Sequence, residues 1–190
     1  MGKVSREDIV KEFPMLEDIT DAEIRNSVVD IWGEVLETSA WDDLLTPRSS
    51  ERDPDISLVS HTRGVTRNAI CIAKNAEEEY GTVIDYNELI ASCLLHDVSK
   101  LLEFEPSGDG KIGARETEIA QKYQHGFYGA YYAEKHGLSG NIVSNIISHT
   151  PFSRMLPVSY EGIILIHADA ADSDIHKLKL KESLFAAKLK

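Results

Sequence analysis

An apolar run that ends in ionisable residues is the feature that most constrains this chain. Residues 89–95 read LIASCLL, a composition suited to a helix buried in a core. His96 and Asp97 follow side by side, and Lys100 stands about one helical turn after His96. Burying an imidazole and a carboxylate in apolar surroundings is costly unless a partner compensates them. The rest of the chain must therefore supply compensating groups.

The hydrophobic pattern predicts helices along nearly the whole chain. We expect helices over residues 5–13, 20–38, 60–80, 85–104, 116–136, 139–149 and 158–173. Gly81, Gly137 and Pro151 act as stop signals between them. No segment alternates convincingly with period two, so the sequence predicts an all-α helical bundle.

Two stretches do not fit the helical pattern. Residues 39–57 form a charged connector that contains two prolines, and residues 105–116, EPSGDGKIGARE, have the strongest loop composition in the chain. We therefore expect an N-terminal helical extension and connector over 1–57, a domain over 58–175 and an amphipathic tail over 176–190. The extension could cover a site or form a homodimer contact.

Composition limits the classes of partner. The chain has 190 residues and a net charge of −12, which argues against a nucleic-acid duplex or an anionic membrane surface as partner. Its two cysteines form no disulfide framework, and this fits a reducing compartment. The first residues lack the apolar core of a secretory signal, and no stretch approaches a membrane span, so we expect a cytoplasmic protein.

Four histidines and two aspartates stand out because they accompany apolar helical stripes. They are His61, His96, Asp97, His125, His149 and Asp169. A single histidine on an apolar face is more often an ordinary core residue, but that explanation is poor for the whole set. If the stripes face one core, these side chains converge, as in the metal sites of helical bundles. Mixed imidazole and carboxylate ligands suit Fe, Mn, Ni or Zn better than Ca or Mg.

This ordered series resembles the HD-domain superfamily of metal-dependent phosphohydrolases. SHTRGVTRNAICIA is similar to the opening helix of that family, and LLHDVSK to its HD-x-x-K signature, with Ser99 where Gly is more usual. QHGFYGAYYAEKHG, IVSNIISHTP and ILIHADAAD are similar to the segments that carry the remaining ligands. The resemblance covers about residues 58–175, and it is loosely closest to bacterial dinucleoside-tetraphosphate hydrolases.

The resemblance implies two transition-metal ions, with Fe or Mn expected. His61, His96, Asp97 and Asp169 would hold one ion. Asp97 would bridge to a second ion, which His125 and His149 also bind. Asp97 and Lys100 are the expected catalytic residues, with Lys100 binding a phosphate or activating a leaving group. Asp172, three residues after Asp169, is expected to support a ligand.

The resemblance implies a phosphohydrolase that uses a metal-activated hydroxide on a nucleotide or another small phosphorylated molecule. An alternative is an HD-type mixed-valence di-iron oxygenase that cleaves a C–P or C–C bond of a phosphonate or polyol. A non-catalytic binding module is a third possibility, which the complete ligand set disfavours.

Four basic residues are candidates for substrate binding. Arg63 and Arg67 share a helix face near His61, and Lys111 and Arg115 lie in or just after the glycine-rich loop. Ordinary solvent exposure explains these four residues about as well as substrate binding does.

Overall fold

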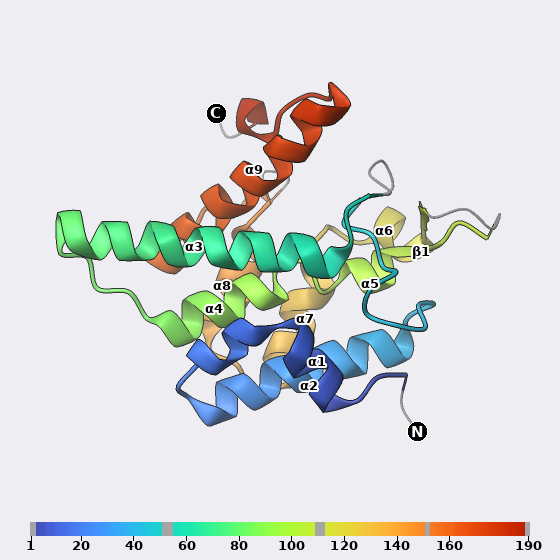
Figure 1. Cartoon of the computed structure of the whole chain (residues 1–190), viewed down its shortest axis with the longest axis horizontal. Helices are drawn as coiled ribbons and strands as arrows, with labels where there is room; N and C mark the ends of the chain where they lie inside the picture. The colour runs from blue at the N-terminus through green and yellow to red at the C-terminus, as the bar shows by residue number, and fades with distance from the viewer. Residues whose placement is uncertain (1–2, 51–54, 109–112, 151–152, 189–190) are drawn as a thin grey trace.

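The computed structural model describes residues 3–50, 55–108, 113–150 and 153–188, and helices dominate it (Figure 1). The elements are α1 (Arg6–Glu12), the 3₁₀ helix η1 (Pro14–Asp18), α2 (Ala22–Thr38), α3 (Leu58–Tyr80), α4 (Tyr86–Leu95), α5 (Lys100–Glu103), β1 (Phe104–Pro106), β2 (Ala114–Glu116), α6 (Glu118–Lys122), α7 (Phe127–Lys135), α8 (Gly140–Ser148), α9 (Tyr160–Leu180) and the 3₁₀ helix η2 (Phe185–Lys188). The predicted all-α class is confirmed, since within the described ranges the strands form only a two-stranded hairpin.

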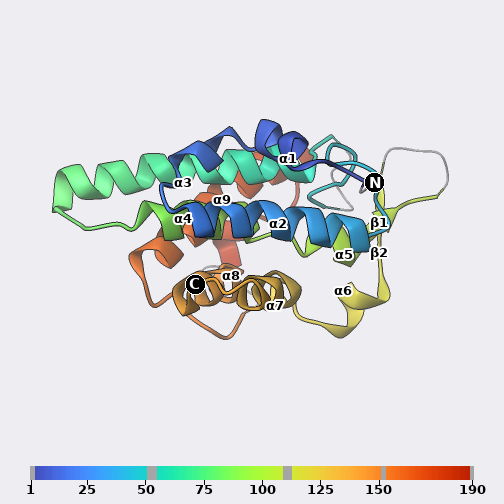
Figure 2. The same cartoon turned by 90° about the horizontal axis from the view of Figure 1, so that it is seen from below.

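Helix α4 is the centre of the arrangement. It contacts α2, α3, α8, α9 and η1, and residues 89–95 are buried along its length. Figure 2 shows α2 and α4 in the middle of the molecule, with α1 and α3 on one side and α7 and α8 on the other. The end of the apolar run therefore lies deep inside the bundle.

The N-terminal extension packs directly onto α4. The Trp32 side chain is fully buried, its ring centroid lies 4.7 Å from that of Phe13, and its indole N–H donates a 2.9 Å hydrogen bond to the Leu94 carbonyl. Trp41 makes an equivalent bond of 2.9 Å to the Phe104 carbonyl. The indoles thus fix the backbone on each side of the His96–Asp97 pair in the sequence.

The predicted helix over 85–104 is interrupted at residues 96–99. Here the backbone hydrogen bonds join each N–H to the carbonyl three residues earlier: Val98 to Leu95 at 3.1 Å and Lys100 to Asp97 at 2.9 Å. The chain therefore tightens into 3₁₀-like turns between α4 and α5. The hydrophobic pattern does not predict this interruption, because the buried residues Leu101 and Leu102 continue the apolar run after it.

The predicted helix over 116–136 is also interrupted. Helix α6 ends at Lys122 and α7 begins at Phe127, with His125 in the break. Gly126 has a φ of 86°, and a Cβ built there would lie 3.0 Å from the Ile146 carbonyl oxygen. Glycine is needed because this backbone conformation and this close approach both disfavour a side chain.

The glycine-rich loop and the tail also differ from the prediction. Residues 104–106 and 114–116 pair as an antiparallel hairpin, with Glu105 opposite Arg115. Helix α9 runs to Leu180, beyond the expected end at residue 173, and η2 then folds back onto it.

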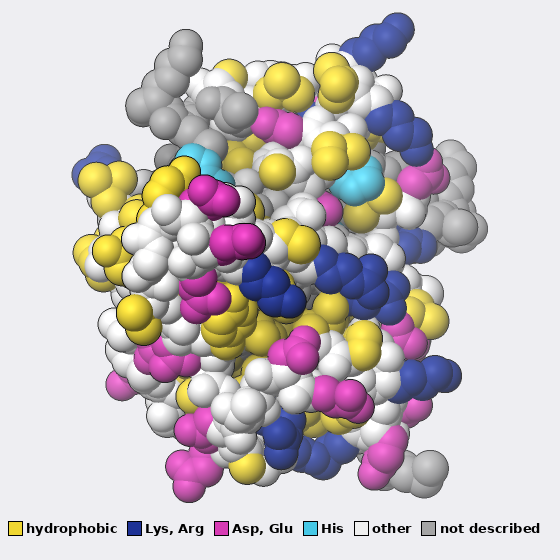
Figure 3. Space-filling model, turned by 60° about the vertical axis from the view of Figure 1, so that its left-hand side comes forward, with side chains coloured by type: hydrophobic (Ala, Val, Ile, Leu, Met, Phe, Trp, Pro, Cys, Tyr) yellow, Lys and Arg dark blue, Asp and Glu magenta, His cyan; other side chains and the backbone are white. Residues whose placement is uncertain are grey.

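The surface carries charges of both signs. On the face drawn in Figure 3, acidic and basic side chains are interspersed among hydrophobic ones. Among the helices that the structure describes, none combines the length and the apolar character needed to cross a membrane.

The Trp32 hydrogen bond gives a stability prediction. Trp32→Phe leaves the buried Leu94 carbonyl without its donor, which costs about 1–3 kcal/mol of unfolding free energy. Urea denaturation followed by far-UV circular dichroism measures this. Tyr80→Phe is the control, because Tyr80 is 79% exposed and should change the stability by less than about 0.5 kcal/mol. Equal stability of the two variants would contradict the assigned role of the indole.

Candidate metal centre

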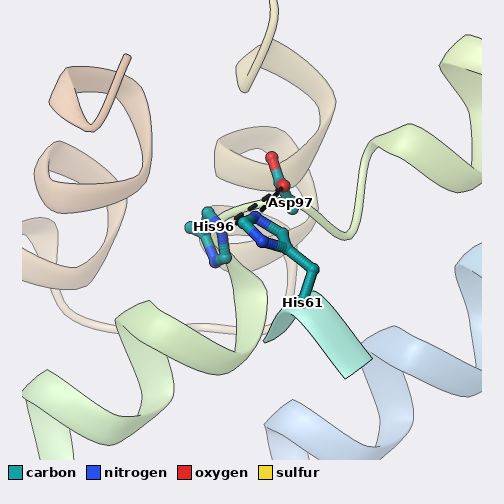
Figure 4. A group of neighbouring side chains, drawn as sticks. All are labelled: His61, His96 and Asp97. Carbon is teal, nitrogen blue, oxygen red and sulfur yellow. Dashed lines mark hydrogen bonds and ion pairs between the residues drawn. The ribbon is translucent and has the colours of Figure 1, made fainter. Parts of the chain in front are cut away.

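Four imidazoles from separate parts of the chain meet at the carboxylate of Asp97. His61 comes from the first turn of α3, and His96 and His149 are the C-terminal caps of α4 and α8. His125 comes from the break between α6 and α7. Figure 4 shows His61, His96 and Asp97 turned toward one another. Both helix interruptions therefore lie where the site is assembled.

Each oxygen of Asp97 faces a different pair of histidines. Oδ2 lies 3.1 Å from Nε2 of His61 and 3.3 Å from Nε2 of His96. Oδ1 lies 2.8 Å from Nε2 of His125 and 3.6 Å from Nε2 of His149. The ligand atoms within each group of three lie within 4.8 Å of one another, close enough for one metal ion. Asp97 is thus shared by two groups.

Asp169 adds a carboxylate to the first group only. Its Oδ1 lies 3.2 Å from Nε2 of His61 and 4.0 Å from Nε2 of His96. It projects from α9, which packs against both α3 and α4. All six residues predicted as ligands are therefore brought together.

Helix ends hold two of the imidazoles in place. Nδ1 of His96 donates to the Cys93 carbonyl at 2.7 Å, and Nδ1 of His149 donates to the Ile146 carbonyl at 2.6 Å. The last backbone carbonyls of a helix have no hydrogen-bond donor within the helix. A histidine at the C-terminal cap can therefore donate a hydrogen bond to the carbonyl three residues earlier. This bond fixes the ring and turns Nε2 into the site.

Carboxylates hold the other two imidazoles. Nδ1 of His61 lies 2.8 Å from Oδ2 of Asp172, the aspartate expected to support a ligand. Nδ1 of His125 lies 2.7 Å from Oε2 of Glu103. The sequence pattern did not predict a role for Glu103. The available signal was a carboxylate six residues after Asp97, in a segment that is otherwise apolar.

The donor set fits a metal ion. Nδ1 of His96 and Nδ1 of His149 face backbone carbonyls, which can only accept, so each of these rings, when neutral, carries its proton there and a lone pair on Nε2. Nδ1 of His61 and Nδ1 of His125 face carboxylates, which can hold a proton on Nδ1 in the same way. Nε2 of His61 and Nε2 of His96 are 3.4 Å apart, and those of His125 and His149 are 3.3 Å apart. A cation between the paired nitrogens would bind both lone pairs.

The charges around the site favour cations as well. Asp97, Asp169, Glu103 and Asp172 all have side chains no more than 14% exposed, and Lys100 is the basic side chain paired with Asp97. Burial raises the pKa of the Asp97 carboxyl, but Lys100 and the adjacent histidines together lower it well below its usual range. The carboxylate is therefore ionised, and the acidic excess calls for positive charge.

A cavity of about 360 Å³ opens onto these ligands. Its lining includes the ligands His61, Asp97, His125, His149 and Asp169, together with Lys100 and Glu103. Nζ of Lys100 lies 2.7 Å from Oδ2 of Asp97, so the predicted catalytic lysine reaches both the cavity and the ligands.

Three of the predicted substrate-binding residues lie outside this cavity. Nη1 of Arg63 forms a 3.0 Å ion pair with Glu12 on α1, and Arg67 is exposed on α3. Nε of Arg115 lies 2.9 Å from Glu105 across the hairpin. Lys111 falls outside the described residues.

Comparisons with known proteins identify the family. The family model described as HD domain matches residues 58–174, which contain all six predicted ligands. A curated relative, the dihydroneopterin 2′,3′-cyclic phosphate phosphodiesterase of Methanocaldococcus jannaschii, is 28% identical over 133 residues. That alignment covers 65% of this chain, and the chain spans 49% of the length of the relative. No solved structure matches the chain significantly.

Gly64 gives a prediction about how His61 is oriented. A Cβ at this position would clash with Oδ1 of Asp172 and lie 3.1 Å from its Cγ. Gly64→Ala should displace Asp172 from His61 and weaken metal binding about 10–100-fold. Titration with Mn²⁺ against a competing chelator measures the affinity.

Gly33→Ala is the matched control within a helix. The nearest atom to a Cβ there is Cδ1 of Ile9 at 3.6 Å, an ordinary contact. This variant should keep the affinity of the wild type. Unchanged metal affinity in Gly64→Ala would show that the Asp172 contact does not position His61.

Proposed function

Because the chain belongs to the HD-domain family, we propose that it is a metal-dependent phosphohydrolase that acts on a small phosphorylated molecule. The observation that carries the proposal is the convergence of four Nε2 atoms on the two oxygens of Asp97. Within the proposed division of the chain, residues 58–175 hold the site, and residues 1–57 support its central helix.

We assign the ligands to two metal ions that share Asp97. His61, His96 and Asp169 would hold the first ion, and His125 and His149 would hold the second. The nitrogen and oxygen donors suit iron or manganese. Metal ions bound there would supply Lewis acidity and would lower the pKa of a bound water.

The reaction we propose is hydrolysis at phosphorus. The oxygen of water forms a bond to phosphorus, the bond between phosphorus and the leaving oxygen breaks, and a proton ends on that oxygen. The rings of His61 and His125 are held by Asp172 and Glu103, so the ligand atoms need little reorganisation during the reaction. The buried position of Asp97 limits access of bulk water to this set.

Lys100 is the proposed phosphate-binding residue. Burial lowers the pKa of its ammonium group, but Asp97 and other nearby carboxylates raise it further, so the net pKa is above its ordinary value. Lys100 therefore stays charged at neutral pH and serves as a fixed cation for a phosphate oxygen or a leaving oxygen. Its charge rules it out as a general base near pH 7.

Small phosphodiesters are the first substrate class to test. The relative from Methanocaldococcus jannaschii is named for a 2′,3′-cyclic phosphate, and its similarity to this chain supports the same bond type here. The oxygenase alternative uses the same ligands, so only the reaction products separate it from hydrolysis.

Metal content tests the ligand assignment. Protein purified without chelator under anaerobic conditions should carry about two transition-metal ions per chain by elemental mass spectrometry. Asp97→Ala should lose both ions and all hydrolysis, because both groups lose their shared ligand. His149→Ala should retain about one ion.

His167→Ala is the control, since His167 is exposed on α9 and should leave two ions bound. Full metal content in Asp97→Ala would overturn the assignment.

Turnover tests the reaction class. Under anaerobic conditions, the metal-loaded protein should open nucleoside 2′,3′-cyclic phosphates to monoesters, as followed by liquid chromatography. Lys100→Met should lower kcat/KM by about 10²–10³-fold, because it removes a fixed charge at the reacting phosphate.

Lys122→Met is the matched control, because Lys122 is exposed on α6. Its activity should equal that of the wild type. Product formation that requires O₂ would favour the oxygenase instead.

A further inference from the structure

Part of the cavity wall comes from residues beyond the end of the family match. The HD-domain model matches up to residue 174. The cavity is also lined by His176, Lys177, Leu180, Glu182 and Phe185, from the end of α9 and the segment after it. The C-terminal segment of this chain therefore borders the same space as the metal ligands.

The backbone after α9 is shaped to bring this segment back. Lys181 adopts the left-handed conformation, with a φ of 58°, and its N–H donates to the Leu178 carbonyl at 3.2 Å. The Glu182 N–H donates to the Lys177 carbonyl at 2.9 Å. The chain thus reverses, and η2 packs against α9.

Phe185 is anchored at the end of this reversal. Its backbone N–H donates to Oδ1 of Asp174, and its side chain is only 8% exposed. Nζ of Lys177 lies 4.8 Å from the centroid of the Phe185 ring, a cation–π distance. An aromatic ring and an ammonium group are therefore held together in the cavity wall.

The cavity is larger than a phosphate group needs. A volume of about 360 Å³ falls in the range of pockets that hold a whole small organic ligand, rather than a phosphate group alone. In the proposed function, the metal site and Lys100 bind the phosphate group of the substrate. Phe185 offers an apolar aromatic surface, and Lys177 offers a cation that also interacts with π-systems.

We propose that the C-terminal segment around Phe185 and Lys177 binds the organic part of the substrate and selects phosphate esters that carry a flat heterocyclic ring. This inference rests on the proposed phosphohydrolase function. Phe185 contacts the ring, and Lys177 contributes its positive charge beside it. The segment lies beyond the matched residues, and we assign it a role in substrate specificity and not in metal binding.

The test compares substrates with and without a ring. Metal-loaded full-length protein is assayed with guanosine 2′,3′-cyclic phosphate and with glycerol 1,2-cyclic phosphate. Phe185→Ala should lower kcat/KM for the guanosine substrate at least tenfold, mainly through KM, and should change that for the glycerol substrate less than twofold. Metal content should stay the same.

Binding supplies a readout that does not depend on turnover. Guanosine 3′-monophosphate is titrated calorimetrically into the wild type and each variant, and its Kd should rise at least fivefold in Phe185→Ala. Phe127→Ala is the matched control, since Phe127 is 48% exposed on α7 and does not line the cavity. Its Kd should not change.

The outcomes separate this inference from the proposed function. If the wild type hydrolyses neither ester, the proposed function fails, and the effect of Phe185→Ala on nucleotide binding still decides the role of the segment. Equal Kd values and equal substrate ratios in the wild type and Phe185→Ala would overturn the inference. If Phe185→Ala does not fold, Phe185→Leu decides, because it keeps the apolar packing without the ring.

Discussion

The carboxylate of Asp97 is the group on which this arrangement depends. It is buried at the centre of a helical bundle, and each of its oxygens faces two imidazole nitrogens. A buried carboxylate is tolerated only when its surroundings compensate its charge. The helices must therefore place hydrogen-bond donors, cations or metal ions around Asp97. Most of the fold serves this purpose.

Irregular backbone segments bring several of these side chains to Asp97. Consecutive residues on a regular α-helix point about 100° apart, so His96 and Asp97 would not readily reach one site from it. The 3₁₀-like turns at 96–99 end α4 and leave the Cys93 carbonyl free to hold His96. The break at Gly126 similarly brings His125 close to His149. The indole of Trp32 bonds to the backbone beside the first of these turns.

The residues that hold the imidazoles in place contribute to both the local structure and the proposed function. Glu103 and Asp172 each fix one imidazole, and Gly64 leaves the space that Asp172 occupies. These contacts lie one layer away from the proposed metals, where a small displacement reduces affinity without unfolding the bundle. The C-terminal segment that carries Phe185 lies beyond the residues that match the family, and it lines the same cavity.

The sequence by itself determined the helical class and most helix positions, because apolar periodicity is a local property. It also indicated the six residues that meet at the centre, through their place on apolar stripes and the resemblance of their order to that of a known family. It did not determine that Glu103 holds His125, that Arg63 pairs with Glu12, or that two predicted helices break. Only the tertiary structure decided these points. Each depends on which residues distant in the chain become neighbours, and burial then makes one partner far more favourable than solvent.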